Sequence, residues 1–498
     1  MTGRMIPEVA QLNRASSLVR IPPAEGVPIS PRVRRIIDSP PMRRLASISQ
    51  LGMVALVYPG ATHSRFEHSL GVYLNSLRLL ARFTGDASLN PPLDARSADA
   101  FVLAALLHDV GHWPYCHPIE DMRLTGFREH ESRVSEWIDQ SELRQCIEQD
   151  WSCEIQDVVD LLEPAKKSAA SQTSPIPLAF LRSCLSGPID IDKLDYLQRD
   201  SLHSGVPYGR NFDVGRLIES MCVHPNKGIL AIGEKGRTAA EMMVFARYVM
   251  FSEVYWHHTV RSATAMLQRA VFLMKDKIEL ESTFKLNDAQ WVTRLVETSN
   301  ALRGTSLGNP HPLVDGLFGA QRRLYKRVAE FNAIDAVEGQ SVEVHRQIAR
   351  RPYWWLVAAS EKLATRVSSM TGETVVAEDI LIDAPPVKLE VDINVDVILR
   401  DGSFDPSASD ADVNVDVSGN ADARVTEKQS RPPLGVTLAN VSPVARALAR
   451  QQFDDQVKRV RVFVHPDKRD MMSRAVRAHG DWSQLLIDVV QSVDNEIV

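Results

Sequence analysis

The sequence predicts a mainly helical protein with a small α+β subdomain towards its C-terminal end. Apolar residues recur at helical spacing across 101–107 and again across about 238–277. Residues 387–399 instead alternate apolar and acidic side chains, which indicates a half-buried strand, and 457–466 indicates a second strand. A long stretch of helical patterns followed by a few short strands favours this fold class.

Three parts are expected along the chain. Residues 1–30 are proline-rich and weakly patterned, which favours a flexible N-terminal arm. Residues 31–376 form the helical domain, and residues 377–498 form the α+β subdomain. Within the subdomain, 401–433 is acidic and poor in large apolar residues, so we expect a disordered loop there.

Composition sets limits on the function classes. Of 498 residues, 24% are charged and 44% hydrophobic, and the net charge of −6 argues weakly against a dedicated nucleic-acid binder. No apolar run approaches the ~20 residues of a membrane span, and no signal peptide is evident, so we expect a cytoplasmic protein. The odd cysteine count without a C-x-x-C favours buried reduced thiols over disulfides or a zinc site. The five are Cys116, Cys146, Cys153, Cys184 and Cys222.

The sequence FVLAALLHDVGHWPYCH, residues 101–117, is the centre of the functional prediction. Its apolar helical run ends in His108-Asp109, and Gly111 then breaks the periodicity. Adjacent side chains on a helix point about 100° apart, so this pair can hold one ion only if other segments complete the shell. Those segments have to come from elsewhere in the chain.

Two other stretches offer suitable residues. HSRFEHSLGVYLNSLRLL, from residue 63, places His68 on an amphipathic helix with Arg65 one turn before it. IDIDKLDYLQRD, from residue 189, places Asp192, Tyr196 and Asp200 four residues apart on one helix face. These spacings favour a single pocket wall.

The motifs HSRFEHSLG, HDVGHWPYCH and DIDKLDYLQRD, in this order, resemble the HD-domain phosphohydrolases, most closely the deoxynucleoside triphosphate triphosphohydrolases of the SAM-and-HD-domain type. The resemblance covers about 32–401 and the last ~60 residues, and several ordered motifs are far more specific than one HD dipeptide. We expect no SAM domain before the catalytic region. The resemblance implies an HD-domain helical core and a homo-oligomer, either a dimer or a tetramer.

His68, His108, Asp109 and Asp192 are the expected metal ligands. Two imidazoles and two carboxylates suit a divalent ion such as Mn, Fe, Mg or Co better than structural zinc, with no choice among these four metals. Such an ion lowers the pKa of bound water or polarises a phosphoryl oxygen.

The resemblance also implies roles for other residues. Catalytic roles fall to His112, Glu120, His130 and Glu131. Substrate contacts fall to Gln50, Leu51, Arg65, His117, Lys193, Tyr196, Asp200, Arg247 and Tyr255. His130, aided by Glu120 or Glu131, is expected to protonate the leaving 5′-oxygen, and Tyr196 is expected to occupy the space of a ribose 2′-OH.

The predicted reaction is metal-dependent hydrolysis of a deoxynucleoside triphosphate (dNTP) to the deoxynucleoside and tripolyphosphate. The sequence has no P-loop and no G-x-G-x-x-G before a helix, so neither ATP-driven work nor a dinucleotide cofactor is expected. An HD phosphohydrolase acting on another nucleotide, a phosphomonoester or single-stranded nucleic acid is the first alternative. A non-catalytic nucleotide sensor is the second.

Overall fold

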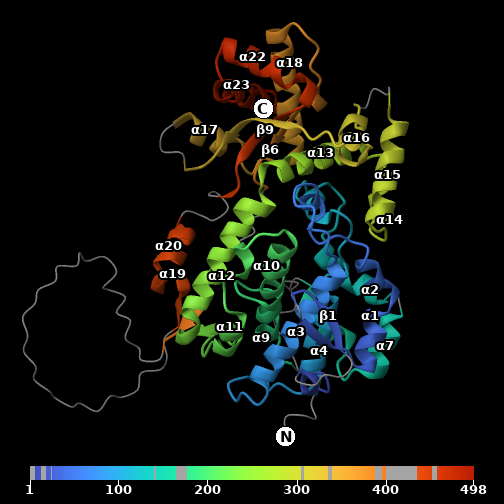
Figure 1. Cartoon of the computed structure of the whole chain (residues 1–498), viewed down its shortest axis with the longest axis vertical. Coiled ribbons are helices and arrows are strands. Elements are labelled where there is room, and N and C mark those ends of the chain that lie inside the picture. The colour runs from blue at the N-terminus through green and yellow to red at the C-terminus, as the bar shows by residue number, and fades with distance from the viewer. Residues whose placement is uncertain are drawn as a thin grey trace, which may run out of the picture.

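The computed structural model describes residues 6–12, 18–23, 25–139, 142–163, 176–303, 308–334, 339–386, 395–399, 435–450 and 457–497. Helices dominate these residues, and the strands form three small sheets. Figure 1 shows α1 to α12 in the lower body, the helices α18, α22 and α23 gathered above it, and α13 reaching between the two. The predicted fold class, mainly helical with a small α+β part, is confirmed.

The helices of the main body run from α1 to α16. They are α1 (Pro31–Ile37), α2 (Pro40–Leu45), α3 (Arg65–Phe83), α4 (Ala95–Leu107), α5 (Cys116–Glu120), α6 (Val134–Asp139), α7 (Leu143–Asp150), α8 (Ile155–Leu162), α9 (Leu178–Leu185), α10 (Ile191–His203), α11 (Val214–Ser220), α12 (Arg237–Met250), α13 (His258–Met274), α14 (Leu280–Thr283), α15 (Asp288–Ala301) and α16 (His311–Phe318).

Helix α3 packs against both α4 and α10. Ser64 starts α3, since its hydroxyl accepts from the backbone N–H of Glu67 at 3.3 Å, and Asp190 starts α10 by accepting from the N–H of Lys193 at 2.8 Å. Helix α4 is buried on every side from residue 98 to its end, which explains why its sequence is apolar all round. Burying each of its large apolar side chains contributes about 1.5–3 kcal/mol, so α4 is a rigid support for the residues that follow it.

The strands form three separate sheets. β1 (Leu18–Ile21) pairs antiparallel with β2 (Glu25–Pro28). A four-stranded sheet has the order β3 (Met221–Val223), β4 (Leu230–Gly233), β7 (Asp396–Ile398), β8 (Gly435–Thr437), with β4 and β7 parallel. An antiparallel sheet has the order β5 (Lys326–Phe331), β9 (Val460–Val464), β6 (Ile380–Asp383).

The C-terminal unit has its own hydrophobic core. Its sheet β5-β9-β6 packs with α17 (Gly339–Ile348), α18 (Tyr353–Thr371), α22 (Arg469–His479) and α23 (Trp482–Ile497) around buried Trp355, Val460 and Leu486. A buried ion pair joins this unit to the main body: Arg261 of α13 donates to both carboxylate oxygens of Asp383 on β6, at 3.1 and 2.6 Å. This fork fixes the edge of the C-terminal unit against α13.

The described residues divide differently from the expected boundary at 377. Strand β5 and helices α17 and α18 precede that boundary yet belong to the C-terminal unit. Strands β7 and β8, with α19 (Leu438–Val441) and α20 (Pro443–Arg450), follow it yet join the main core through residues such as Val397 and Leu438. The two predicted strands therefore lie in different sheets, because β7 pairs with β4 and β9 with β5 and β6. The predictions for 387–394 and 401–433 lie outside the described residues.

The N-terminal segment also differs from the expected arm. Its β1–β2 hairpin packs on α3, and Ile6, Val27 and Ile29 lie in the main core. Tyr73 of α3 donates its hydroxyl to the carbonyl of Pro28 at 2.9 Å. These apolar residues have no regular spacing, so the sequence pattern does not reveal them. They nevertheless hold the described part of this segment on the helical body.

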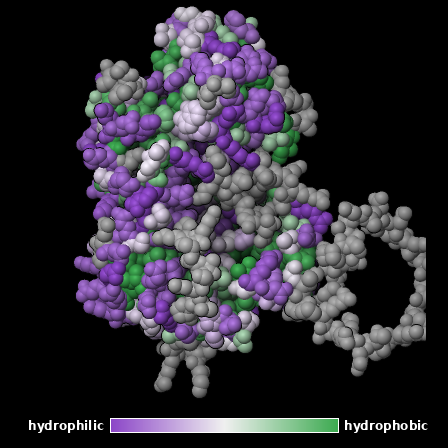
Figure 2. All heavy atoms as spheres, turned by 180° about the vertical axis from the view of Figure 1, so that it is seen from behind, coloured by the Kyte–Doolittle hydropathy of each residue, from purple (hydrophilic) through white to green (hydrophobic). Residues whose placement is uncertain are grey.

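The described helices include none with both the length and the apolarity needed to cross a bilayer. On the face seen in Figure 2, hydrophilic side chains cover much of the described surface and hydrophobic ones gather in small groups. No continuous apolar face is therefore in view on the part of the chain described there.

Candidate active site

The turn that follows α4 is held from two sides. Helix α4 ends at Leu107, His108 is its C-cap, and Gly111 lies where a Cβ atom would stand 2.2 Å from the carbonyl oxygen of His130. Arg44 donates to the carbonyls of Val110 and His112, each at 2.8 Å. The glycine at 111 is therefore required by the close approach of two backbones, and the turn is fixed in place.

Three predicted ligands converge from three different elements. The Nε2 atom of His68 lies 2.9 Å from Oδ1 of Asp192 and 3.2 Å from Nε2 of His108. The three side chains can each offer one ligand atom within a common sphere. Asp109, the fourth predicted ligand, lies beside them, with its Oδ1 3.4 Å from Nε2 of His108. Two imidazoles with one or two carboxylates fit a divalent cation with open positions for water and substrate.

The tautomers of both imidazoles suit metal binding. Nδ1 of His68 lies 2.8 Å from a carboxylate oxygen of Asp195, and Nδ1 of His108 lies 2.9 Å from the carbonyl oxygen of Ala105. Both partner atoms accept hydrogen bonds, so each Nδ1 carries the proton and each Nε2 offers its lone pair. Burial lowers the pKa of His68, but Asp192 and Asp195 outweigh it and raise that pKa to about 10. A cation bound at Nε2 would take the place of that additional proton.

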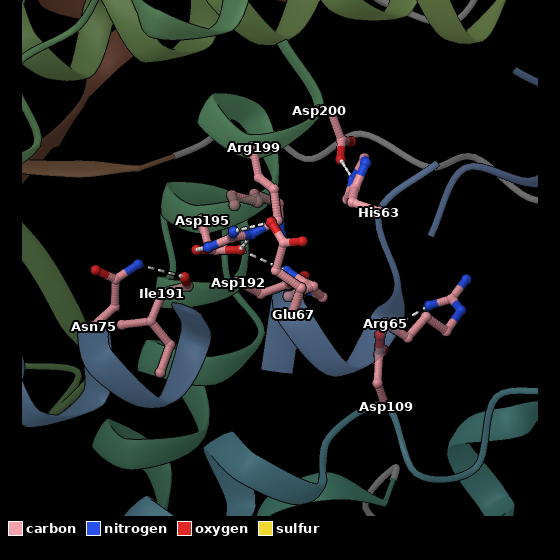
Figure 3. A network of polar contacts seen from close by, with 12 residues as sticks. His63, Arg65, Glu67, Asn75, Asp109, Ile191, Asp192, Asp195, Arg199 and Asp200 are labelled. Carbon is pink, nitrogen blue, oxygen red and sulfur yellow. Dashed lines mark hydrogen bonds and ion pairs between the residues drawn. The ribbon is translucent and has the colours of Figure 1, made fainter. Parts of the chain in front are cut away.

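Asp195, which contacts His68, belongs to a network with Arg199 and Glu67, and Figure 3 shows these last three residues together. Asp195 receives two hydrogen bonds from Arg199, at 2.8 and 2.7 Å, and Arg199 also donates to Glu67 at 2.6 Å. Gly71 of α3 makes room for this network, because a Cβ there would stand 1.8 Å from Oδ1 of Asp195. The imidazole of His68 is thus oriented by α10, the helix that also carries Asp192.

Arg65 provides positive charge at the same site. Its Nη1 donates to Oδ2 of Asp109 at 2.9 Å, and both side chains are buried (Figure 3). Burial alone would raise the pKa of Asp109, but His112, His108 and Arg65 hold it well below its usual range. Asp109 is therefore an anionic group at neutral pH.

The predicted histidines lie together next to this centre. Nε2 of His112 lies 3.4 Å from Nε2 of His117, and the rings of His112 and His130 have centroids 3.7 Å apart. Glu120 holds His130, since one carboxylate oxygen lies 2.9 Å from Nδ1 and the other accepts from the backbone N–H at 2.8 Å. Burial raises the pKa of Glu120, yet the contacts with His130 lower it overall to about 2. Glu120 is thus ionised and keeps His130 Nε2 turned away from it.

The metal ligands, Arg65 and the group of histidines with Glu120 line one cavity of about 760 Å³. The sequence-predicted residues that line it are Gln50, Leu51, Arg65, His68, His108, Asp109, His112, His117, Glu120, His130, Glu131, Asp192, Tyr196, Asp200 and Tyr255. Lys193 and Arg247 are not among the lining residues. Lys193 instead directs its Nζ to Asp190 at 2.6 Å, and Arg247 is buried within α12.

The end of the cavity away from the metal ligands is polar and preorganised. Asp200 lies between His63 Nε2, at 2.9 Å, and the hydroxyl of Tyr255, which donates to it at 2.6 Å. Tyr196 lines the same cavity. Among the described residues, the side-chain oxygen of Gln50 is buried with no hydrogen-bond partner.

Sequence reasoning missed the residues that support the site. Asp195 contacts the ligand His68, and Arg199 holds Asp195. His63 contacts Asp200, and Arg44 holds the turn after α4. No role was predicted for these four residues, although three of them lie within the quoted motifs. The spacing of Asp195 and Arg199, four apart on α10, signals an ion pair, but only the crossing of α3 with α10 shows that it faces His68.

Two family models and several known proteins match this chain. Residues 65–177 match the HD domain, and residues 212–405 match the HD associated region. A protein of uncharacterised function from Methanocaldococcus jannaschii is 29% identical over 371 residues, 74% of this chain and 68% of that protein. The deoxynucleoside triphosphate triphosphohydrolase SAMHD1 of Homo sapiens is 27% identical over 300 residues, 55% of this chain and 47% of that protein. This chain thus spans about half of that relative.

Two solved structures share the fold. A hypothetical protein from Aquifex aeolicus superposes with a TM-score of 0.60 at 22% identity, covering 92% of this chain and 99% of that one. A phosphohydrolase from Bacteroides thetaiotaomicron gives 0.59 at 21% identity, covering 90% and 99%. With an HD domain, an HD associated region and relatives of this kind, the chain belongs to the HD-domain phosphohydrolase family.

Proposed function

We propose that this protein is a metal-dependent phosphohydrolase that converts a dNTP to the deoxynucleoside and tripolyphosphate. The observation that carries the proposal is the placement of three kinds of group in one cavity: the metal-ligand set around His68, the histidines around His130 and the polar end around Asp200. A cavity of about 760 Å³ is of the size that holds a nucleotide. The names of the SAMHD1 relatives supply the substrate class.

The metal ion would be held by His68, His108 and Asp192, with Asp109 beside them. When bound, it supplies Lewis acidity towards a phosphoryl oxygen and acidifies water. Arg65, fixed by Asp109, offsets the negative charge of the phosphate chain. His112 and His117 face the same space and offer nitrogen donors to phosphate oxygens.

The proton for the leaving group is assigned to His130. Water adds to the α-phosphorus and releases one proton to solvent, the bond from phosphorus to the 5′-oxygen breaks, and Nε2 of protonated His130 gives its proton to that oxygen. Glu120 keeps Nδ1–H in place and, as a carboxylate, stabilises the imidazolium before transfer. In this proposal Glu120 is the partner of His130, rather than Glu131.

Sugar selection is assigned to the polar end. The 3′-hydroxyl would donate its one proton to the carboxylate of Asp200 and accept from the side-chain amide of Gln50, which lines the same cavity. Tyr196 lies on the same helix face as Asp192 and Asp200, where its ring would occupy the space of a 2′-hydroxyl. A ribonucleotide would then be excluded sterically.

A metal-by-substrate screen with product identification tests this function. The purified protein is stripped of metal, reloaded separately with Mn, Fe, Mg or Co, and given dNTPs, ribonucleotides, a phosphomonoester and single-stranded DNA. The proposal expects tripolyphosphate from dNTPs alone. Orthophosphate as the sole product, or cleavage of DNA, would instead support a different HD phosphohydrolase. Nucleotide binding without any product would support a sensor.

A further inference from the structure

A second group of metal-ligating side chains lies in the cavity, separate from the His68 centre. His112, Cys116, His117 and His130 each offer one ligand atom, and these atoms all lie within 4.8 Å of one another. They come from three short segments: the turn after α4, the first two residues of α5, and the start of the short helix η4 (His130–Arg133). Three imidazoles and one thiol are the donor set of a tetrahedral zinc site.

The groups behind these ligands are of the kind that supports metal-bound histidine. Nδ1 of His130 is hydrogen-bonded to Oε2 of Glu120 at 2.9 Å. Nδ1 of His112 lies 3.1 Å from Oδ1 of Asp109 but without the geometry of a hydrogen bond. Carboxylates at Nδ1 orient an imidazole and increase the basicity of Nε2. The two Nε2 atoms of His112 and His117 then face each other at 3.4 Å.

The burial of the ligands defines how an ion could enter. Cys116 and His112 are buried, whereas the side chain of His117 is 60% exposed and faces the solvent side of the cluster. Burial raises the pKa of the Cys116 thiol, so an entering ion has to displace its proton to solvent, as metals do when they coordinate a thiol. An ion therefore enters past His117 and ends against Cys116.

We propose that His112, Cys116, His117 and His130 form a second metal site that takes a borderline-soft cation, zinc, and inhibits the enzyme when occupied. A thiolate ligand favours zinc over the hard ions that suit carboxylates, so this site and the His68 centre differ in preference. Zinc bound here would occupy the nitrogen atoms of His112 and His117, which are assigned to phosphate binding, and of His130, which is assigned to proton transfer. The inhibition rests on the proposed function, whereas the binding does not.

Cobalt(II) binding tests the site directly, because a thiolate ligand on cobalt produces a charge-transfer band in the near ultraviolet. Metal-free protein titrated with cobalt should show this band, with a final amplitude that corresponds to one thiolate-bound ion per chain. Cys116→Ser should abolish it, whereas Cys153→Ser, which changes another buried cysteine, should retain it. His108→Ala, which removes a ligand of the other centre, should also retain it. No band in the wild type, or a band that survives Cys116→Ser, overturns the site.

A second variant keeps the test sound if Cys116→Ser fails to fold. His117→Ala changes a largely exposed side chain, so the fold should persist, and cobalt affinity should fall at least about tenfold. An unchanged affinity contradicts the assignment.

Zinc inhibition separates this inference from the proposed function. With the His68 centre loaded with manganese, zinc should inhibit dGTP hydrolysis, and Cys116→Ser should raise the zinc concentration for half inhibition at least about tenfold. If the thiolate band is present but no hydrolysis is detected, the second metal site is supported and the proposed function is contradicted. If hydrolysis is detected but the thiolate band is absent, the proposed function is supported and the second metal site is contradicted.

Discussion

At the scale of single residues, Asp195 determines how His68 faces the metal. Its carboxylate accepts from His68 Nδ1 at 2.8 Å, so Asp195→Asn should weaken manganese affinity by about 10- to 100-fold while the ligands themselves remain. Glu67→Gln is the matched control, because Glu67 contacts Arg199 in the same network but not His68. Metal titration of both variants is the measurement. Equal affinity in wild type and Asp195→Asn would show that this contact does not orient the ligand.

Tyr196 should control sugar discrimination. Tyr196→Ala opens the space next to Asp200, so the ratio of kcat/KM for dGTP over GTP should fall by about tenfold or more. Tyr196→Phe keeps the ring and should keep the ratio. Steady-state kinetics of the three proteins on both nucleotides measure this. An unchanged ratio in Tyr196→Ala would assign discrimination to other residues of the cavity.

At the scale of elements, the start of α15 is tied to the segment before Gln50. Asp288, the first residue of α15, accepts from the backbone N–H of Ser49 at 2.9 Å, and burial raises its pKa to about 6. A raised carboxyl pKa adds stability below the unfolded value of 3.8, and this stability is lost as pH rises through about 6.

Asp288→Asn should therefore be more stable than wild type at pH near 7.5 and similar to it at pH near 4. The pKa shift sets an upper limit of about 3 kcal/mol, and partial exposure reduces the expected gain to about 1 kcal/mol. Thermal unfolding across this pH range measures it. Lower stability of the variant at both pH values would mean that the negative charge itself is needed at the helix start.

The link between α13 and β6 carries a separate prediction. Asp383→Ala leaves Arg261 buried beside Trp256 without its carboxylate, so the free energy of unfolding should fall by about 3–5 kcal/mol. Arg327→Ala removes an ion pair at the surface between Arg327 and Glu330, both on β5 of the same sheet, and should cost under about 1 kcal/mol. Chemical denaturation of both variants compares them. Equal losses would mean that the buried fork adds nothing to the attachment of the C-terminal unit.

At the scale of the whole molecule, the sequence predicts what is local. Helix α4 and the ligand pair at its end are visible because apolar periodicity and a dipeptide lie in one stretch. The partnership of His68 with Asp195 is not visible, because it depends on how α3 crosses α10. The assignment of β7 and β9 to different sheets escapes for the same reason, since strand pairing depends on long-range contacts that neither sequence contains. Cys116 was expected to be a buried reduced thiol because the cysteine count is odd and the sequence has no C-x-x-C.

The homo-oligomer stays a prediction of the resemblance, and the choice among Mn, Fe, Mg and Co stays open. The chemistry of the metal centre can be tested in one experiment. Phosphorus NMR of dGTP incubated with manganese-loaded protein follows every product, and elemental analysis of the same samples measures bound metal. The wild-type protein should convert dGTP to tripolyphosphate and deoxyguanosine. Folded Asp109→Ala or His108→Ala should form neither product and should bind no manganese. Full hydrolysis by these variants without bound metal would contradict it.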